Sequence, residues 1–375
     1  MEQIKHLVVG AGLTGAVVAQ QIAAKKNEPV LVIDKRDHVA GNAYDYVDLA
    51  TRIIVHRYGP HVFHTNEKRV WDYLSQFTEW HYFMYHVLAM IDGLVVNIPF
   101  NFTSLYKVFP RVLADQLAQK LLAKFSYGQK ISADDLQRSG DADLKFLGDY
   151  VYQKVFLGYN LKQWGLRPEE LDPSVAQRVP IYLAADERYF QDKYQAIPMK
   201  GYTAMVENML RSPLITVKTK TDFAELRNSI TAENIYYTGS IDEFFSYQLG
   251  ALPYRSLQIQ IKKYDTPYFQ DGPQLNFSEN YDYTRSCEYK YYLDQKSNHT
   301  IVSFEYPCAF EVGKNERFYP IANDAHHQLY QQYVALAKQQ KVTGVHFLGR
   351  LGIYRYLNMD QVVALALDFC EKQFA

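Results

Sequence analysis

Apolar and polar residues follow two different periods along the chain, which predicts a mixture of β-strands and α-helices. Short apolar runs bounded by turn residues predict strands, whereas apolar residues three or four positions apart predict helices. We expect strands over residues 4–9, 29–33, 82–91, 94–100, 215–218, 235–238, 257–261, 300–306 and 345–350. We expect helices over residues 16–26, 67–77, 111–125, 141–156, 324–341 and 359–372.

The order of these elements predicts more than one domain. Helical periodicity dominates residues 103–164, which indicates a small helical domain. Asp92-Gly93, between two apolar runs, is a strong signal for a β-hairpin. Residues 257–261 alternate strictly between apolar and polar side chains. These strands therefore predict an antiparallel sheet.

The first thirty-four residues contain a recognisable ligand-binding pattern. A strand ends in Gly10-Ala11-Gly12-Leu13-Thr14-Gly15, a helix follows, and the next strand ends in Asp34. Gly10 allows the tight turn, Gly12 lets the backbone approach a pyrophosphate, and Gly15 lets the helix pack on its strand. A carboxylate about twenty residues later binds ribose hydroxyls. The pattern predicts a dinucleotide-binding βαβ unit.

The residues after Asp34 favour FAD over a nicotinamide cofactor. Arg36 and the small pair Ala40-Gly41 resemble the extended fingerprint of FAD enzymes of the glutathione-reductase type, although Ala40 stands where that pattern usually has glycine. Thr238-Gly239 ends a later strand that resembles the one facing the flavin, and residues 345–350 resemble the last strand meeting the FAD phosphates. Because the expected FAD contacts run from the start to the end of the chain, they predict a discontinuous FAD domain with other domains inserted.

Composition sets further limits on function. The 375 residues suffice for two or three domains, and a formal net charge of −1 gives no electrostatic attraction to nucleic acid or a membrane surface. No apolar run is long enough to span a membrane, and the start of the chain passes directly into a strand. The three cysteines lack metal or redox spacing. We expect a cytoplasmic protein without membrane insertion or nucleic-acid binding.

Five motifs, in order, resemble the UDP-galactopyranose mutase family over essentially the whole chain. They are residues 59–65 (GPHVFHT), 158–165 (GYNLKQWG), 186–192 (DERYFQD), 283–285 (YTR) and 349–356 (GRLGIYRY). The resemblance implies an α/β fold: a discontinuous Rossmann-like FAD-binding domain with an inserted helical domain and an antiparallel β-sheet domain. The expected ranges are 1–66, 196–245 and 335–375 for the FAD domain; 101–178 for the helical domain with a mobile substrate loop; and 67–100, 179–195 and 246–334 for the sheet domain.

The resemblance also implies an activity. The family interconverts the pyranose and furanose rings of a nucleotide-linked galactose, with no net redox change but only with reduced flavin. N5 of the reduced flavin attacks the anomeric carbon and displaces the nucleotide diphosphate, and the sugar ring opens and recloses through another hydroxyl. The product would enter furanose-containing surface polysaccharide. Members are often dimeric, so a homodimer is a further expectation.

Residue by residue, the resemblance places a diphosphate clamp and a substrate pocket. Arg178 and Arg285 match the arginines that grip the diphosphate, a role that suits bidentate guanidinium groups; surface salt bridges are the alternative. The residues that match substrate positions are Val155, Tyr159, Asn160, Trp164, Tyr189, Phe190, Asn276, Tyr319 and Tyr356. Core packing is the alternative for the aromatic residues, and the spacing from Asn276 to Arg285 is one residue short.

The remaining assignments concern the cofactor and the histidines. His61 and His64 lie in a loop that the family places over the flavin; both also suit a structural role, and no neighbouring residues have metal-ligand spacing, so we expect no metal. The residues assigned to cofactor binding are Gly10, Gly12, Thr14, Gly15, Asp34, Lys35, Gly41, Asn42, His56, Thr238, Gly239, Arg350, Asn358 and Met359.

Three departures from the family leave the substrate open. Val155 replaces a frequent Phe, Asn160 a usual Thr, and Asn358 an Asp near flavin and substrate. A related sugar (N-acetylated or deoxy) on UDP or dTDP is therefore an alternative substrate. An FAD oxidase or dehydrogenase, and a non-catalytic nucleotide-sugar or flavin-binding protein, are the alternative functions.

Overall fold

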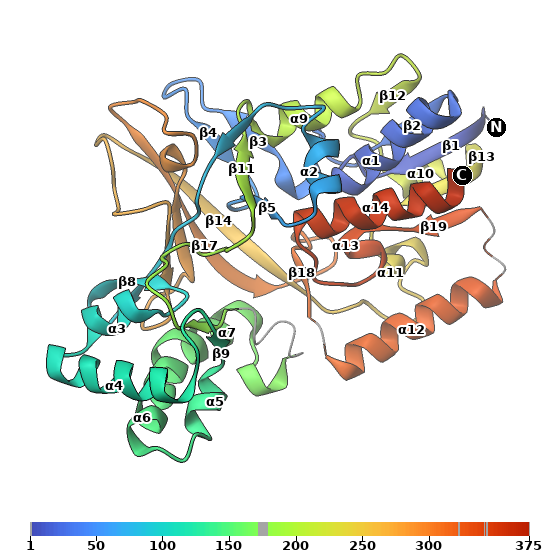
Figure 1. Ribbon diagram of the computed structural model, residues 1–375. Coiled ribbons are helices and arrows are strands. Elements are labelled where there is room, and N and C mark those ends of the chain that lie inside the picture. The colour runs from blue at the N-terminus through green and yellow to red at the C-terminus, as the bar shows by residue number, and fades with distance from the viewer. Residues whose placement is uncertain (1, 172–178, 322, 341, 343, 375) are drawn as a thin grey trace. The chain divides into compact units, whose positions relative to one another are not determined.

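A computed structural model describes residues 2–171, 179–321, 323–340, 342 and 344–374 (Figure 1). The chain forms two compact units, each assembled from separate segments. Unit 1 contains Met1–Phe83, Asp192–Tyr254 and Val312–Ala375, and unit 2 contains Met84–Gln191 and Arg255–Glu311. The three-domain division expected from the sequence stays a prediction.

Unit 1 is built on a parallel sheet. Its strands, in spatial order, are β12 (Ile215–Lys218), β2 (Val30–Ile33), β1 (Glu2–Val9), β13 (Ile230–Tyr237) and β19 (Val345–Phe347). Every neighbouring pair is parallel. The strands are rich in Val, Ile and Leu, and Val8, Val32 and Ile33 are fully buried, as both faces of a covered parallel sheet require.

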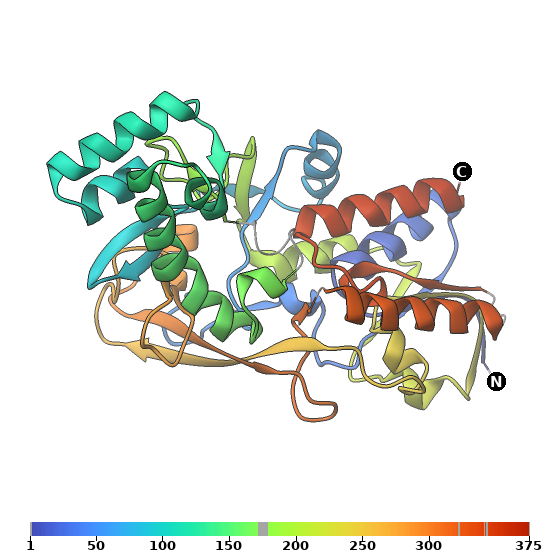
Figure 2. The ribbon, with the colours of Figure 1, turned by 90° about the horizontal axis from the view of Figure 1, so that it is seen from below.

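Helices cover both faces of this sheet. Helix α1 (Leu13–Gln21) lies beside α14 (Met359–Phe374), as Figure 2 shows for the blue and red helices. On the other face Leu7, Leu31 and Ile33 form a core with Phe223 and Leu226 of α10 (Phe223–Leu226). The remaining helices of unit 1 are α2 (Lys68–Leu74), α9 (Gly201–Met209), α11 (Ile241–Phe244), α12 (Asp324–Gln339) and α13 (Gly349–Gly352).

A second, small sheet of unit 1 explains where one sequence prediction is wrong. The predicted strand 82–91 is divided: its first residue ends β6 (Trp80–Tyr82), which pairs with β11 (Tyr194–Pro198), and β11 pairs with β5 (Phe63–Thr65). Trp80 stacks on Trp71 with ring centroids 4.7 Å apart. Aromatic stacking therefore keeps this segment out of the hairpin. Strands β3 (Asp45–Val47) and β4 (Ile54–His56) form a separate pair.

Unit 2 is built on a larger sheet. The strands of this sheet that belong to unit 2 are, in spatial order, β14 (Tyr254–Tyr264, which begins in unit 1), β17 (Thr300–Ala309), β16 (Arg285–Glu288), β15 (Gln274–Phe277), β7 (Val87–Ile91) and β8 (Leu94–Ile98). The hairpin at Asp92-Gly93 is confirmed. One pair differs from the expected antiparallel pattern, because β15 runs parallel to β7. The helices lie between these two strands in the sequence, so a parallel crossover is available.

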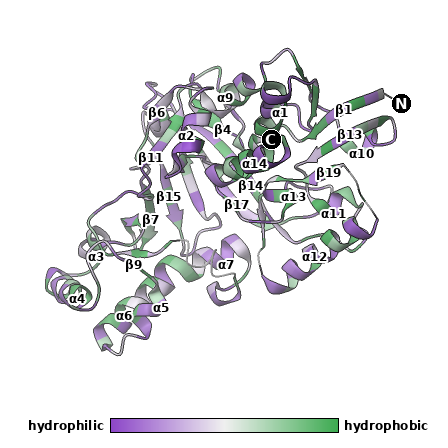
Figure 3. Cartoon of the chain, turned by 45° about the vertical axis from the view of Figure 1, so that its right-hand side comes forward, coloured by the Kyte–Doolittle hydropathy of each residue, from purple (hydrophilic) through white to green (hydrophobic). Residues whose placement is uncertain are grey.

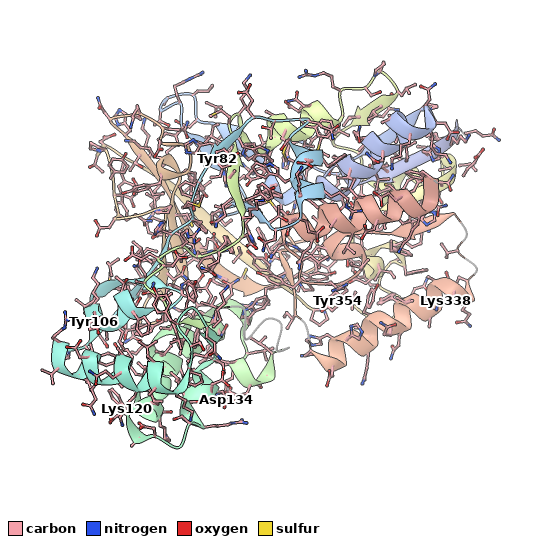
Figure 4. The ribbon with its side chains drawn as sticks, viewed as in Figure 1. Tyr82, Tyr106, Lys120, Asp134, Lys338 and Tyr354 are labelled. Atoms are coloured by element: carbon pink, nitrogen blue, oxygen red, sulfur yellow. The ribbon has the colours of Figure 1, made fainter. Side chains whose placement is uncertain are left out.

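The helical group of unit 2 contains α3 (Phe102–Val108), α4 (Arg111–Lys124), α5 (Ala133–Gln137), α6 (Ala142–Val151), the π-helix η3 (Tyr152–Leu157) and α7 (Gly158–Trp164). The predicted helix 111–125 is confirmed to within one residue. The helix predicted over 141–156 instead continues through η3 into α7. The ribbons of this group carry both hydrophilic and hydrophobic colours (Figure 3), as partly exposed helices require. Tyr106, Lys120 and Asp134 mark α3, α4 and α5 in Figure 4.

Residues 165–195 have charges and prolines but little periodicity, which predicts a mobile loop, yet part of this segment has regular structure. It contains the short 3-10 helix η4 (Pro168–Glu170) and strand β10 (Ile181–Tyr182), which pairs with β9 (Lys130–Ile131). Residues 172–178 lie outside the described residues.

Among the residues that the structure describes, every helix is too short or too polar to cross a lipid bilayer.

Candidate functional site

The carboxyl ends of three neighbouring strands form a cradle in unit 1. Gly10 follows β1, and its N–H donates to the carbonyl of Ile33 at 2.8 Å. Thr238 follows β13 and donates to the Val9 carbonyl through its N–H (2.9 Å) and its hydroxyl (2.8 Å). Strands β2 and β13 lie on opposite sides of β1. Open α/β sheets bind ligands at such a switch point.

At two positions of this cradle, Gly10 and Gly15, only glycine fits. A Cβ on Gly15 would lie 1.9 Å from the Gly10 carbonyl oxygen, and a Cβ on Gly10, whose φ is +101°, would lie 2.1 Å from Thr238 Oγ1. A Cβ on Gly349, directly after β19, would lie 3.0 Å from Thr14 Oγ1. Gly12 is the N-cap residue of helix α1, and among the described residues no side chain caps this helix. Its first N–H groups and its dipole therefore suit a phosphate.

Asp34 is positioned at the edge of the cradle. Its carboxylate accepts hydrogen bonds from the N–H groups of Ala11 (2.8 Å) and Arg36 (2.9 Å). A carboxylate offers about four acceptor positions, so Asp34 retains capacity for ribose hydroxyls. The neighbouring Lys35 forms an ion pair of 3.4 Å with Glu243.

A second turn completes the cradle. A Cβ on Gly41 would lie 3.0 Å from the Gly12 Cα, so the two glycine turns are in close contact. Ala40 donates to the Ala11 carbonyl at 2.9 Å and has a φ of +70°, the left-handed region that favours glycine. Asn42 donates to the Arg317 carbonyl at 3.5 Å. Together these turns fit a dinucleotide, and they explain why the FAD fingerprint usually has glycine where this chain has Ala40.

The three candidate histidines have different environments. His56 is buried, and burial lowers its pKa to about 3. The main-chain N–H of His61 donates to His56 Nδ1 at 3.0 Å. The ring Nδ1 of His61 donates to the Gly59 carbonyl at 2.8 Å, so Nε2 of His61 is the acceptor nitrogen when its ring is neutral. His64 Nδ1 lies 2.8 Å from the carboxylate of Asp192. Sequence reasoning missed Asp192 as a functional partner, although it belongs to one of the five family motifs.

Tyr319, Tyr356 and Arg350 form one cluster in unit 1. The two tyrosine rings are 5.4 Å apart, and the Arg350 guanidinium lies 5.9 and 5.7 Å from their centroids. Arg350 also donates to the carbonyl of Leu357 at 2.6 Å. Its predicted contact with a pyrophosphate stays a prediction. The other candidates here, Asn358 and Met359, precede and begin α14.

In unit 2, one continuous helical run carries four of the predicted substrate residues. Val155 lies on η3, and Tyr159, Asn160 and Trp164 lie on α7. Val155, Asn160 and Trp164 are buried, whereas Tyr159 is partly exposed. π-Helices occur often at functional sites because they locally reset the direction of side chains.

Arg285 is held by a buried carboxylate that sequence reasoning missed. Its Nε donates to Glu305 Oε2 at 2.5 Å, and the Glu305 side chain is fully buried. Burial raises the Glu305 pKa, while the Arg285 charge opposes this shift. Asn276 lies directly opposite Arg285 across the β15–β16 pair. The strand register therefore places Asn276 beside Arg285 despite the irregular spacing in the sequence.

Tyr189 and Phe190 belong to another aromatic cluster of unit 2. Their rings are 4.8 Å apart, and both lie near Tyr85, at 5.9 and 6.0 Å. The Tyr85 hydroxyl donates to Gln274 at 2.5 Å, and Gln274 donates to Asn276 at 2.8 Å. These hydrogen bonds connect the cluster to the strand that carries Asn276.

Two further points concern the described residues only. Arg178 lies outside them, so its predicted role has no structural description. Within the described parts of the chain, no three or more His, Cys, Asp or Glu side chains are arranged to hold a metal ion.

Comparisons with known proteins identify the family of this chain. A family profile described as UDP-galactopyranose mutase matches residues 154–356, and one described as an NAD(P)-binding Rossmann-like domain matches residues 8–77. The chain is 35% identical to a probable UDP-galactopyranose mutase of Klebsiella pneumoniae over 98% of this chain and 94% of that protein. It is 32% identical to a dTDP-fucopyranose mutase of Escherichia coli over 97% of each chain.

Solved structures show the same fold. A reduced UDP-galactopyranose mutase superposes with a TM-score of 0.71 at 13% identity, covering 100% of this chain and 94% of that one. A putrescine oxidase superposes with a TM-score of 0.56 at 11% identity, over 99% of each chain, and shows the fold alone. The predicted α/β class with a Rossmann-like dinucleotide-binding domain is confirmed. The profile and the chain-long relatives establish that the chain belongs to the UDP-galactopyranose mutase family.

Proposed function

We propose that this protein interconverts UDP-galactopyranose and UDP-galactofuranose with FAD as its cofactor, active in the reduced form. The observation that carries the proposal is 35% identity over 98% of the chain to a probable UDP-galactopyranose mutase. The glycine cradle of unit 1 favours the assignment of a dinucleotide cofactor. Its turns leave room for a pyrophosphate to approach the main chain, and a carboxylate lies at its edge. Gly10, Gly12, Gly15, Gly41 and Asp34 would hold the dinucleotide.

Reduced FAD, when bound, supplies N5 as the nucleophile for the anomeric carbon. The chain then has to hold a departing diphosphate. Arg285 is suited to this role because Glu305 accepts from its Nε, which holds the guanidinium in one orientation. Arg178 is proposed as the second arginine of the clamp. Trp164 and Tyr159 offer aromatic faces for the base and sugar.

The histidine loop is proposed to contact the cofactor. His61 is fixed in one tautomer by the Gly59 carbonyl, and His64 by Asp192. A fixed tautomer presents one defined nitrogen, so each ring can hold or accept a proton at Nε2 without reorienting.

Product analysis tests the proposal. Purified protein is incubated with UDP-galactofuranose, with and without dithionite, and the nucleotide sugars are separated by chromatography. We expect UDP-galactopyranose only after reduction. Conversion without reduction would contradict the requirement for reduced flavin, and reoxidation of the flavin coupled to substrate consumption would favour an oxidase.

A dTDP-linked deoxy sugar is the second candidate substrate. It is favoured by 32% identity to a dTDP-fucopyranose mutase over 97% of each chain. Val155, Asn160 and Asn358 depart from the residues usual in the family, and we propose that these differences affect substrate choice. Parallel reactions with dTDP-fucofuranose and UDP-galactofuranose separate the two: the larger kcat/KM identifies the substrate.

The remaining expectations are proposals as well. We place the enzyme in the cytoplasm, supplying a furanose sugar for surface polysaccharide, with no macromolecular partner other than a second copy of the chain. Cell fractionation tests the cytoplasmic location. Gel filtration at several protein concentrations tests whether the protein forms a homodimer.

A further inference from the structure

Lys162 has an unusual environment on α7. Its ammonium group lies within hydrogen-bond distance of four main-chain carbonyls: those of Phe277 (2.6 Å), Glu279 (3.0 Å), Tyr281 (3.1 Å) and Tyr283 (3.3 Å). The four residues alternate along the turn between β15 and β16, so every second carbonyl of that turn is directed at one point. The turn encloses the ammonium group as it would enclose a bound cation.

This turn leads directly into the proposed diphosphate-binding residue. Tyr283 is followed by the fully buried Thr284 and then by Arg285 at the start of β16. The Thr284 hydroxyl lies 3.3 Å from Gln163 Oε1 of α7, and the Thr284 carbonyl accepts from the Phe277 N–H at 2.8 Å. The position of Arg285 therefore depends on the geometry of the turn.

Other contacts join the same helix to the same turn. A Cβ on Gly158, the first residue of α7, would lie 2.0 Å from the Ser278 carbonyl oxygen. At the other end of α7, Arg255 donates to the carbonyls of Gln163 (2.7 Å) and Lys162 (3.0 Å), which satisfies acceptors that a helix terminus leaves open. The interface between α7 and the turn is thus closely fitted, and Lys162 provides its positive charge.

We propose that Lys162 is a positioning residue that fixes the turn before Arg285 against α7, and so sets the spacing between the diphosphate-binding arginine and the substrate residues on α7. The inference rests on the proposed function for its ligand, a nucleoside diphosphate. Lys162 is assigned no contact with substrate. Converging carbonyl dipoles repel one another and lose their hydration in this turn, so they require a donor with positive charge at the centre.

The titration of Lys162 offers an independent readout. Burial lowers its pKa to about 8, and the Asp282 carboxylate opposes this shift. Other charged or titratable groups on the elements around it include Lys154, Tyr159, Arg255, Glu279, Tyr281, Tyr283, Arg285, Glu288 and Glu305. Loss of the proton above about pH 8 removes one donor and the charge, so UDP binding should weaken in that range.

The test compares Lys162→Met with Lys290→Met. Lys290 is buried, whereas Lys162 is half-buried, and Lys290 likewise donates to main-chain carbonyls, those of Pro267 and Ser297, but these belong to other segments. Dissociation constants for UDP are measured by calorimetry on the FAD-loaded proteins. We expect Lys162→Met to weaken UDP binding about tenfold or more, and Lys290→Met to change it less than about twofold, because only the first variant releases the turn before Arg285 from α7.

A double-mutant cycle distinguishes positioning from a general loss of structure. If Lys162 acts through Arg285, the effects of Lys162→Met and Arg285→Lys on UDP binding should be strongly non-additive, whereas Lys290→Met and Arg285→Lys should be additive. The weakening of UDP binding above about pH 8 should also be absent from Lys162→Met. Additive effects, or the same alkaline weakening in the variant and the wild type, would overturn the proposal.

Two further outcomes keep the inference separate from the proposed function. Wild-type protein that binds UDP but converts no nucleotide sugar would contradict the mutase assignment and leave the role of Lys162 intact. If Lys162→Met does not fold, Lys162→Gln replaces it; its amide has two N–H donors for four carbonyls. Unchanged UDP affinity in a folded Lys162→Gln protein would overturn the role of Lys162.

Discussion

Arg285 depends on a partner that lies on another strand. Its Nε donates to the buried Glu305, so one edge of the guanidinium is occupied and the group has a fixed orientation. A guanidinium can meet a carboxylate and a phosphate at the same time through different nitrogens, whereas an ammonium group is a single donor centre. The geometry therefore favours arginine over lysine at this position.

Arg285→Lys should lower kcat/KM about 100-fold, since a lost charge-assisted hydrogen bond is worth about 1.5–3 kcal/mol. Flavin content should not change, because the cofactor cradle belongs to unit 1. Steady-state kinetics and the flavin absorbance of the purified variant provide the two readouts. Near-normal turnover would contradict the role of Arg285 in holding the diphosphate.

His56 makes the stability of the protein sensitive to acid. Burial holds its pKa at about 3, below the ordinary value of 6.5. Between these values the unfolded chain binds a proton that the native protein does not bind, so the free energy of unfolding falls as the pH falls from 6.5 towards 3. At pH 5 the loss from this residue is about 2 kcal/mol.

His56→Gln should remove that part of the acid sensitivity, because the amide oxygen can still accept from the His61 N–H and does not titrate. Urea denaturation at about pH 7 and about pH 5 measures the difference between the variant and the wild type. His327→Gln, at an exposed position of α12, is the control and should behave as the wild type. Equal acid destabilisation in His56→Gln and the wild type would contradict the assignment.

In unit 1, the N-terminus of helix α9 is capped by a residue that is remote from it in the sequence. Helix α9 begins at Gly201, which has a φ of +87°, and no side chain of its own segment caps it. Asp45 of β3 takes this role: its carboxylate accepts from the N–H groups of Tyr202 (2.6 Å) and Thr203 (3.0 Å). A carboxylate at a helix N-terminus both accepts these hydrogen bonds and interacts favourably with the dipole.

Asp45→Ala should lower the free energy of unfolding by about 2 kcal/mol, at the upper end for a cap because the carboxylate is buried. Asp222→Ala is the matched control: it caps the short helix α10 through the Ala224 N–H in an exposed position, so about 0.5–1 kcal/mol is expected. Chemical denaturation compares the two. An equal loss in both variants would show that burial adds nothing to the Asp45 cap.

The entire chain passes between its two units four times, because each unit is assembled from separated segments. Each unit nevertheless has its own sheet and core. Since the glycine cradle belongs to unit 1, a bound cofactor adds stability to that unit directly. A ligand at about 100 times its dissociation constant adds about 2.7 kcal/mol to the part that binds it.

Calorimetry of FAD-loaded and FAD-stripped protein should therefore show two unfolding transitions. FAD should raise the midpoint temperature of one of them by several degrees. Flavin fluorescence identifies the step that releases the cofactor. A single transition in both samples would show that the four chain crossings couple the units into one cooperative structure.

Local sequence signals predicted a large part of the fold. The glycine turn at residues 10–15, the Asp92-Gly93 hairpin and the helix 111–125 were all found where the pattern placed them. Predictions were wrong where a remote partner intervened. Trp80 stacks on Trp71, so the run beginning at Tyr82 was divided between two sheets, and η3 changed the pitch of the helix expected over 141–156.

The candidate site shows the same limit. The family resemblance predicts roles for Arg285 and Trp164, but Glu305, Asp192 and Lys162 have no local signal that assigns a partner. Lys162 meets a turn more than a hundred residues later in the chain. The register that places Asn276 opposite Arg285 depends on how β15 and β16 pair with the rest of their sheet.

By itself the sequence determined the family, the dinucleotide fingerprint and most of the helices and strands, because these depend on residues close together in the chain: backbone sterics at glycine, turn chemistry and apolar periodicity. Only the tertiary structure decided which side chains orient Arg285 and cap α9, and which main-chain carbonyls enclose the ammonium of Lys162. Those contacts require two distant segments to be packed at hydrogen-bond distance, and neither segment alone contains that information.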